Sequence, residues 1–239
     1  MANKRVSYTE VPPSFVSDAE LKHHAQLFSS HYGKWGENPH GLQKGARVRL
    51  TASRLRSDHL FDEQRCSLIR ATISEGETVH VVGHACVYCY EVPGKGKVSW
   101  ITQLVVHSDY RHRGVAKKLC RMAWPVEQFY AVGLVTSHPY AVRALERATQ
   151  RTCNRATIMP VARELLSQCN IPYVLDKALC FEEGRCLIDT QFFVDHTDVN
   201  NILATTLDTE WELGGLEDGK EFFAFTFAAS PNTCLPLPS

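Results

Sequence analysis

The segment from Leu104 to Ala116 constrains the fold more than any other part of the chain. An apolar run ends at Val106, a turn of sequence Arg111-x-x-Gly114-x-Ala116 follows, and a helical pattern begins at once. A strand that passes through a glycine turn into a helix leaves backbone N–H groups at the helix N-terminus without partners, and the positive end of the helix dipole lies behind them. The sequence therefore predicts a phosphate-binding site at this junction.

The composition is that of a globular protein. The chain has 239 residues, of which 44% are hydrophobic and 22% are charged, which is enough apolar material for one large domain. Its net charge is zero, with 26 residues of each sign, so a basic site must be local and we expect neither nucleic acid nor membrane as a partner. We expect a single domain over residues 1–229 and a flexible tail at 230–239, which contains several prolines.

Cysteine usage and hydropathy indicate the compartment. The N-terminus lacks the apolar segment of a secretory signal, and no run of about 18 apolar residues occurs, so we expect a soluble, cytoplasmic protein. Nine cysteines, an odd number scattered through apolar segments, are typical of reduced thiols. Cys86 and Cys89 form a lone Cys-x-x-Cys pair, but strand geometry points them to opposite faces, so we expect no metal site.

The spacing of apolar residues predicts a mixed α/β fold. Three apolar runs separated by turn residues predict an antiparallel meander over 66–73, 79–92 and 98–107. Around it we expect strands at 5–11, 131–136, 186–195 and 222–227, and helices at 18–32, 53–61, 115–124, 139–149, 160–168 and 198–207. Ser17 and Glu20 fit a capping box at the first helix, Ser53 is the expected cap of the second, and Pro160 is expected to open the fifth.

This order of elements, with Leu104-x-Val106 shortly before Arg111-x-x-Gly114-x-Ala116, resembles the GNAT superfamily of acyl-CoA-dependent N-acyltransferases. The family signature is Gln/Arg-x-x-Gly-x-Gly/Ala, and the chain supplies Arg, Gly and Ala in that order. The resemblance is strongest over residues 66–149. It implies a GNAT-like mixed, mostly antiparallel sheet flanked by helices, and an enzyme in which an amine directly attacks the thioester of acetyl-CoA or another acyl-CoA.

The resemblance also implies which residues contact the co-substrate. The turn amides of family members hold its pyrophosphate, which here corresponds to Arg111, His112, Arg113, Gly114, Val115 and Ala116. Together with Arg111 and Arg113, Lys117 and Lys118 add local positive charge, although such residues also occur at the solvated start of any surface helix. The backbone of Leu104, Val105 and Val106 would pair with the pantetheine arm, and the Val106 N–H would polarise the thioester carbonyl; the alternative for these three is a plain core strand.

Two proton-transfer residues of the family are missing from this chain. Histone-type members place a glutamate on the strand that corresponds to residues 98–107, where this chain has Trp100 and no carboxylate. Many members also carry a tyrosine that protonates the thiolate, on the helix that corresponds to residues 139–149, where this chain has Leu145. The proton of the attacking amine needs another route here, because an alkylamine is mostly protonated near neutral pH.

His138 is the main candidate for this role. It lies just beyond a short strand, and the ordinary pKa of histidine suits a base, an acid or a cofactor contact. An ordinary histidine at a helix start is the alternative. Tyr140 is a second candidate for the acid, and Asp195 with His196 for the base.

The acceptor site is predicted from three residues. Tyr32 and Trp35 match the region that lines acceptor pockets in the family, although ordinary aromatic packing also explains them. Gln103, with Thr102, can orient an acceptor, but a bulge in this strand would change which side chains face it.

These observations leave several functions open. The leading hypothesis is transfer of an acetyl group to the primary amine of a small molecule, because the additional segment at 150–220 is of the kind that caps a pocket. A protein N-terminus or lysine is the runner-up acceptor. An inactive CoA-binding regulatory module and other acyl-thioester chemistry, such as O-acyl transfer or decarboxylation, are the alternatives. The sequence does not determine the oligomeric state.

Overall fold

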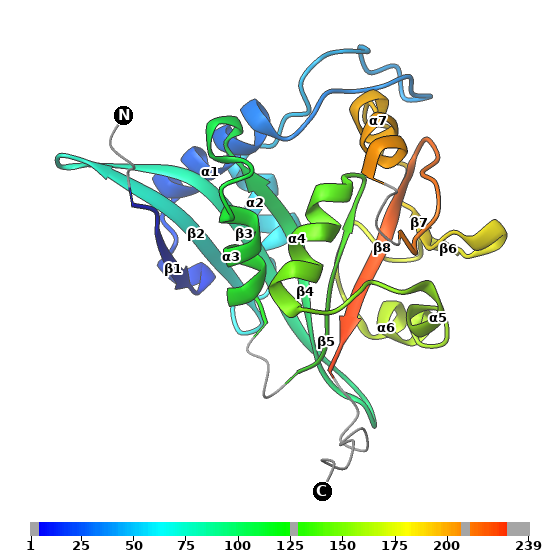
Figure 1. The fold of residues 1–239 in the computed structure, drawn as a ribbon. Coiled ribbons are helices and arrows are strands. Elements are labelled where there is room, and N and C mark those ends of the chain that lie inside the picture. Colours follow the sequence, from blue (N-terminus) through cyan, green and yellow to red (C-terminus); the bar gives the residue numbers. More distant parts are fainter. Residues whose placement is uncertain (1–4, 125–128, 207–210, 229–239) are drawn as a thin grey trace, which may run out of the picture.

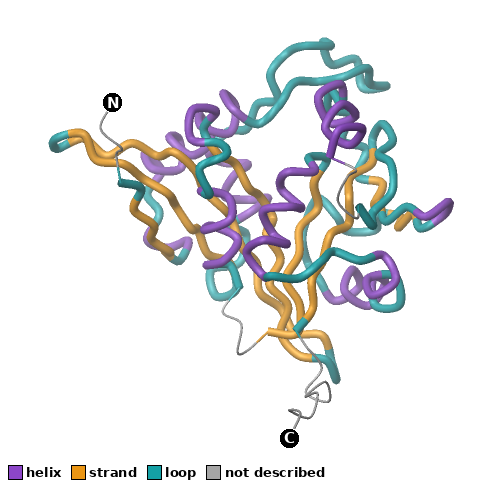
Figure 2. Tube along the Cα trace, viewed as in Figure 1, coloured by secondary structure: helices purple, strands orange, loops and turns teal. Residues whose placement is uncertain are grey.

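The computed structural model describes residues 5–124, 129–206 and 211–228. Its strands and helices follow one another as β1 Ser7–Val11, α1 Asp18–His31, α2 Ala52–His59, β2 Cys66–Glu75, β3 Thr78–Val92, β4 Gly96–Val106, α3 Val115–Met122, β5 Phe129–Thr136, α4 Pro139–Thr149, α5 Arg155–Ile158, α6 Ala162–Gln168, β6 Ala178–Cys180, β7 Leu187–Asp189, α7 Thr197–Thr206 and β8 Lys220–Phe227. Figure 2 shows helices on both sides of the strands.

The strands form one eight-stranded sheet in the order β1-β2-β3-β4-β5-β8-β7-β6 (Figure 1). Neighbouring strands are antiparallel except for β4 and β5, which are parallel. The expected mixed α/β fold with a mostly antiparallel sheet is therefore confirmed, and so is the meander of β2, β3 and β4. No helix in these ranges is both long and apolar enough to cross a bilayer.

Local sequence signals place several elements correctly. The Ser17 hydroxyl accepts a hydrogen bond from the Glu20 N–H at 3.3 Å, and the Glu20 carboxylate accepts one from the Ser17 N–H at 3.0 Å, so the capping box of α1 is present. Helix α4 begins at Pro139 and ends at Thr149, as the apolar spacing predicts.

The expected starts of two helices were wrong. Thr51, not Ser53, caps α2, because its hydroxyl accepts from the Arg54 N–H at 3.2 Å and Ser53 lies inside the helix. Helix α6 begins at Ala162 rather than Pro160, since the short helix α5, which was not expected, comes first and Pro160 lies in the turn between the two.

The strand expected at 186–195 is also much shorter, and β6 was not expected. Gln191 has a φ of 59°, which ends the extended conformation after Asp189. The chain then leaves the sheet, and Val194 pairs with Trp35 in an isolated bridge. The predicted tail at 230–239 lies outside the described residues.

Two successive residues of β3, which point to opposite faces of the sheet, show which helices cover each face. A side chain at Gly83 would meet Val115 and Leu119 of α3. The next residue, His84, lies 3.2 Å from His24 of α1 between their Nδ1 atoms. Helix α4 packs beside α3 (Figure 1). Thus α3 and α4 lie on one face, and α1 lies on the other.

A glycine allows three strands to close over a pair of aromatic rings. Trp100 of β4, Gly133 of β5 and Phe225 of β8 are aligned across the sheet. The rings of Trp100 and Phe225 have centroids 5.0 Å apart, and a Cβ at Gly133 would lie only 2.2 Å from the Phe225 ring. Any side chain at residue 133 would displace this buried ring.

We predict that Gly133→Ala lowers the free energy of unfolding by about 1–3 kcal/mol, as overpacking of a core does. Urea titration measures the change, and Gly215→Ala is the control, since a Cβ there meets no atom within 4 Å. A Gly133→Ala protein as stable as the wild type would contradict this account of the packing.

Candidate active site

Strands β4 and β5 pair over only part of their length. Their last aligned pair is Ile101 with Leu134, whereas β4 continues to Val106 with β3 as its neighbour. Figure 1 shows the two strands together at their lower ends and apart at their upper ends. The upper part of β4 therefore presents a free backbone edge to the gap.

The direction of the backbone groups on this edge follows from one hydrogen bond. The His107 N–H donates to the Val82 carbonyl at 2.9 Å, toward β3. Because backbone groups alternate along an antiparallel pair, the N–H groups of Leu104 and Val106 point the other way, into the gap. Val105 instead packs its side chain in the cluster that contains Phe28 of α1. The edge thus offers two N–H donors to an extended ligand.

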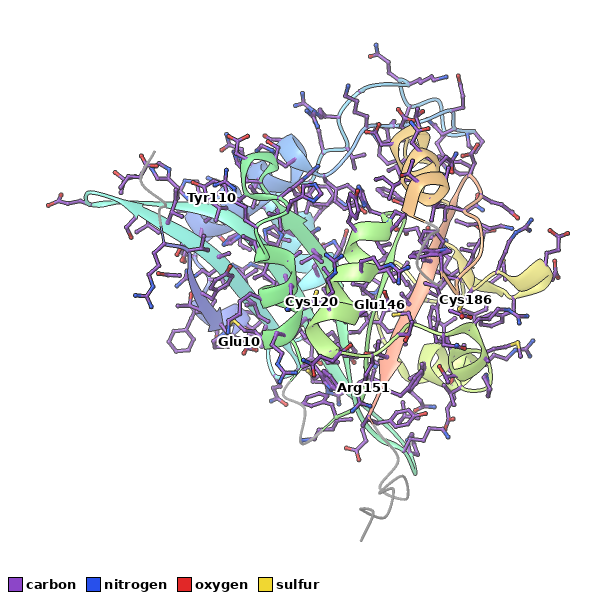
Figure 3. All side chains as sticks on the ribbon, in the orientation of Figure 1. Glu10, Tyr110, Cys120, Glu146, Arg151 and Cys186 are labelled. Carbon is purple, nitrogen blue, oxygen red and sulfur yellow. The ribbon has the colours of Figure 1, made fainter. Side chains whose placement is uncertain are left out.

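The loop after β4 is exposed and shaped by left-handed backbone. His112 has a φ of 58° and Gly114 a φ of 79°. The first hydrogen bond of α3 runs from the Lys118 N–H to the Gly114 carbonyl, so the N–H groups of residues 115–117 have no partner within the helix. Figure 3 labels Tyr110, just before this loop, and Cys120, inside α3. The predicted anion site is open to solvent.

The basic residues of the loop divide into two groups. The Arg111 guanidinium donates to the Val106 carbonyl at 3.3 Å and to the His31 carbonyl at the end of α1, so it ties β4 to that helix. Arg113 lies over the Tyr110 ring, 5.3 Å from its centroid, and Lys117 is exposed. Arg111 is thus engaged by two backbone carbonyls, and the exposed side chains that can contribute positive charge to an anion site are Arg113, Lys117 and Lys118.

A cavity of about 300 Å³ lies where the two strands diverge. The predicted acceptor residues Tyr32, Trp35 and Gln103 all line it. Tyr32 ends α1 on one face of the sheet, and Ala141 of α4 lines the same cavity from the other face. The cavity therefore passes through the gap between β4 and β5.

Aromatic side chains form one wall of the cavity. The rings of Phe28 and Tyr32 stack with centroids 4.2 Å apart, and Trp35 meets Phe192 edge to face at 5.2 Å. The bridge between Trp35 and Val194 brings these distant segments together. Tyr32 and Trp35 therefore both pack against other aromatic rings and line the cavity.

A chain of buried polar groups fixes Gln103. The strand has a bulge at Thr102, the irregularity that would change which side chains face the acceptor, and it places Gln103 on the face that carries His84. His84 Nε2 lies 2.6 Å from Gln103 Oε1, and the two Nδ1 atoms of His84 and His24 are 3.2 Å apart. Burial lowers the pKa of His84 to about 4 and that of His24 to about 2, so both rings are neutral at pH 7. The amide oxygen can only accept, so this assignment leaves the Gln103 NH₂ group as a donor.

Glu221 is a cavity residue that the sequence did not reveal. It lies one residue before the Phe222–Thr136 pair, it is only 5% exposed, and burial raises its pKa to about 7. Its charge also raises the pKa of Tyr32 and of Tyr173, after the larger effect of burial. The available signal was an acidic residue directly before the aromatic strand 222–227.

The predicted catalytic residues His138 and Tyr140 lie beside the loop after β4 and do not line the cavity. His138 Nδ1 accepts a hydrogen bond from the Tyr140 N–H at 3.3 Å and so caps α4. Burial, followed by the nearby Arg111 charge, lowers the pKa of His138 to about 4. The Tyr140 ring lies 5.1 Å from the His112 ring. This arrangement favours the helix-cap alternative for His138 and places Tyr140 next to the loop.

Asp195 and His196, the other candidates for the base, also do not line the cavity. The Asp195 carboxylate accepts hydrogen bonds from the Thr197 N–H at 3.0 Å and hydroxyl at 2.7 Å, at the start of α7. His196 is buried, with Nδ1 3.4 Å from Asp218. Both residues are engaged at a helix start.

We predict that Glu221→Gln stabilises the protein at pH 8. A carboxyl group whose pKa is higher in the folded protein destabilises the fold once the pH exceeds 4.5, its pKa in the unfolded chain. Above about pH 7 this cost reaches its full size of about 3 kcal/mol. The gain of the variant should shrink to below about 1 kcal/mol at pH 5, where few folded molecules carry the charge. Urea unfolding at both pH values measures the difference in the free energy of unfolding between variant and wild type. A variant less stable than the wild type at pH 8 would contradict the prediction, because it would show that the carboxylate stabilises the folded protein.

Comparison with known proteins finds similarity to acetyltransferases. Residues 35–130, which include β2 to α3, match the family model for the Acetyltransferase (GNAT) family. No curated protein sequence matches the chain. Among solved structures, Arabidopsis thaliana NAA60 with acetyl-CoA matches at 16% identity and a TM-score of 0.43, over 61% of this chain and 86% of that one. The NatC complex bound to Gag peptide and CoA matches at 16% identity and 0.42, over 61% and 82%. A soil-metagenome aminoglycoside acetyltransferase with sisomicin matches at 12% and 0.37, over 54% and 76%.

Proposed function

We propose that this chain, whose residues 35–130 match the model of the acetyltransferase (GNAT) family, is a member of that family and transfers an acetyl group from acetyl-CoA to the primary amine of a small molecule. The observation that carries the proposal is the connection between the gap and the cavity. Free N–H groups of Leu104 and Val106 face a gap that has an exposed glycine loop at its outer end. The same gap opens into the cavity that Tyr32, Trp35 and Gln103 line.

The loop residues supply the binding of the nucleotide end. The N–H groups of Val115 and Ala116 are at the helix N-terminus, where the dipole favours a phosphate. Arg113 and Lys117 add charge-assisted contacts. Gly114 holds a left-handed conformation that other residues rarely adopt.

The strand residues supply the chemistry at the thioester, which acetyl-CoA brings to the site. The Val106 N–H donates to the carbonyl oxygen as negative charge develops there, which stabilises the transition state more than the ground state. Tyr140, beside His112 of the loop, remains our candidate for protonating the departing thiolate. His138 holds the start of α4 in place.

The size and the lining of the cavity support a small acceptor over a protein one. A volume of about 300 Å³ is at the lower end of small-molecule sites. Tyr173, Thr190 and Phe192 line it from the segment at 150–220, in the way that a pocket cap would. A protein N-terminus is the second candidate. The cytoplasmic location stays a prediction.

We predict that the purified protein releases free thiol from acetyl-CoA only when a primary amine is present. A thiol-reactive dye with a panel of small amines and a short peptide measures this. Binding of CoA by calorimetry without release with any acceptor would indicate a regulatory module. Release without an acceptor would indicate other acyl-thioester chemistry, and either result would contradict the proposal.

A further inference from the structure

Glu221 is a buried carboxylate without a cationic partner. It is 5% exposed, and within the described ranges no lysine, arginine or histidine forms an ion pair with it. The neighbouring Thr190 side chain lowers the pKa of Glu221, but by less than burial raises it. An isolated buried carboxylate is costly, and such groups are concentrated at functional sites. A ligand is the natural source of the missing positive charge.

The other charged and titratable groups around the cavity are paired, neutral or exposed, so they do not neutralise the charge of Glu221. From α2, Arg54 is paired with Asp58 at 3.0 Å and is largely exposed. Burial lowers the pKa of His59 to about 4, so that ring is neutral at pH 7. Arg49, from the loop before α2, is exposed at the cavity.

Two phenols complete the surroundings of Glu221. Burial raises the pKa of Tyr32 and of Tyr173, so both are neutral hydroxyls at physiological pH. The Tyr173 hydroxyl donates to the Thr102 carbonyl at 3.1 Å, which fixes its ring. Asp58 also lines the cavity, but it is paired with Arg54 at 3.0 Å. Among the described residues that line the cavity, Glu221 is therefore the buried carboxylate that has no cationic partner and can take a proton from an ammonium group.

From this arrangement we infer that Glu221 is the general base for the acceptor amine, and that the acceptors are small primary amines with an apolar or aromatic body. The inference rests on the proposed function and names the substrate class of the same cavity. The carboxylate binds the ammonium group, while the rings of Phe28, Tyr32, Trp35 and Phe192 contact the body. The Gln103 NH₂ group is available to a carbonyl or hydroxyl oxygen beside the amine.

The proton and bond changes balance without any further reactant. The ammonium gives one proton to Glu221 and becomes a neutral amine. Its nitrogen lone pair forms a bond to the acetyl carbon, and the carbon–sulfur bond breaks with its electron pair on sulfur. The thiolate takes a proton from the Tyr140 hydroxyl, the acid named above, and the second proton from nitrogen restores that hydroxyl. Glu221 then releases its proton to solvent, so one amide, one thiol and one proton are formed.

The test compares Glu221→Gln with the wild type at saturating acetyl-CoA and 2-phenylethylamine as acceptor. We expect kcat/KM for the amine to fall at least about 100-fold, as loss of a general base does, with the KM for acetyl-CoA unchanged within about twofold. The wild-type pH profile should rise with a midpoint near pH 7, and the variant should lack this rise. Glu221→Asp should recover at least about tenfold of the loss, because it keeps the carboxylate.

Glu91→Gln, on an exposed position of β3, is the matched control and should behave as the wild type. The wild type should also use 2-phenylethylamine at least about tenfold more efficiently than glucosamine or a tripeptide. Unchanged kinetics in Glu221→Gln would overturn the base assignment, and a preference for glucosamine or the peptide would overturn the acceptor class. If the wild type binds no CoA and acetylates no amine, the proposed function itself has failed.

Discussion

The incomplete pairing of β4 with β5 is the constraint on which the rest of the site depends. Below Ile101 and Leu134 the strands are joined in parallel, and the rings of Trp100 and Phe225 close over Gly133. Above them the strands separate, and backbone N–H groups that a continuous sheet would satisfy are left for a ligand. Arg111 stabilises this separated state, because it joins the end of β4 to the last turn of α1 instead of to β5.

The cavity contains two polar side chains, Gln103 and Glu221, whose surroundings differ. Gln103 is held from behind by neutral histidines, so its geometry is fixed before a ligand arrives. Among the described residues, no cationic side chain pairs with Glu221, and burial makes its ionised form unfavourable. A protein that keeps such a group gives up stability for the activity of the site, as many functional sites do.

Local patterns in the sequence predicted most of the fold, because capping boxes, apolar spacing and glycine turns act within a few residues. The junction at 104–116 and the helix at 139–149 are of this kind. The role of Glu221 was not predictable in this way, since its burial depends on the pairing of β8 with β7, where it is aligned with Ile188, and on the cavity residues Tyr32 and Tyr173 from distant segments. The contact between His24 and His84, 60 residues apart, and the bridge between Trp35 and Val194 likewise arise only from tertiary structure.

Amide hydrogen exchange at Leu104 and Val106, followed by NMR with and without CoA, tests the central claim most directly. The account predicts rapid exchange of both amides in the free protein and strong protection when CoA occupies the gap, while the Val105 amide, directed toward β3, is protected in both states. Protection of Leu104 and Val106 already in the free protein, or no change on addition of CoA, would contradict it.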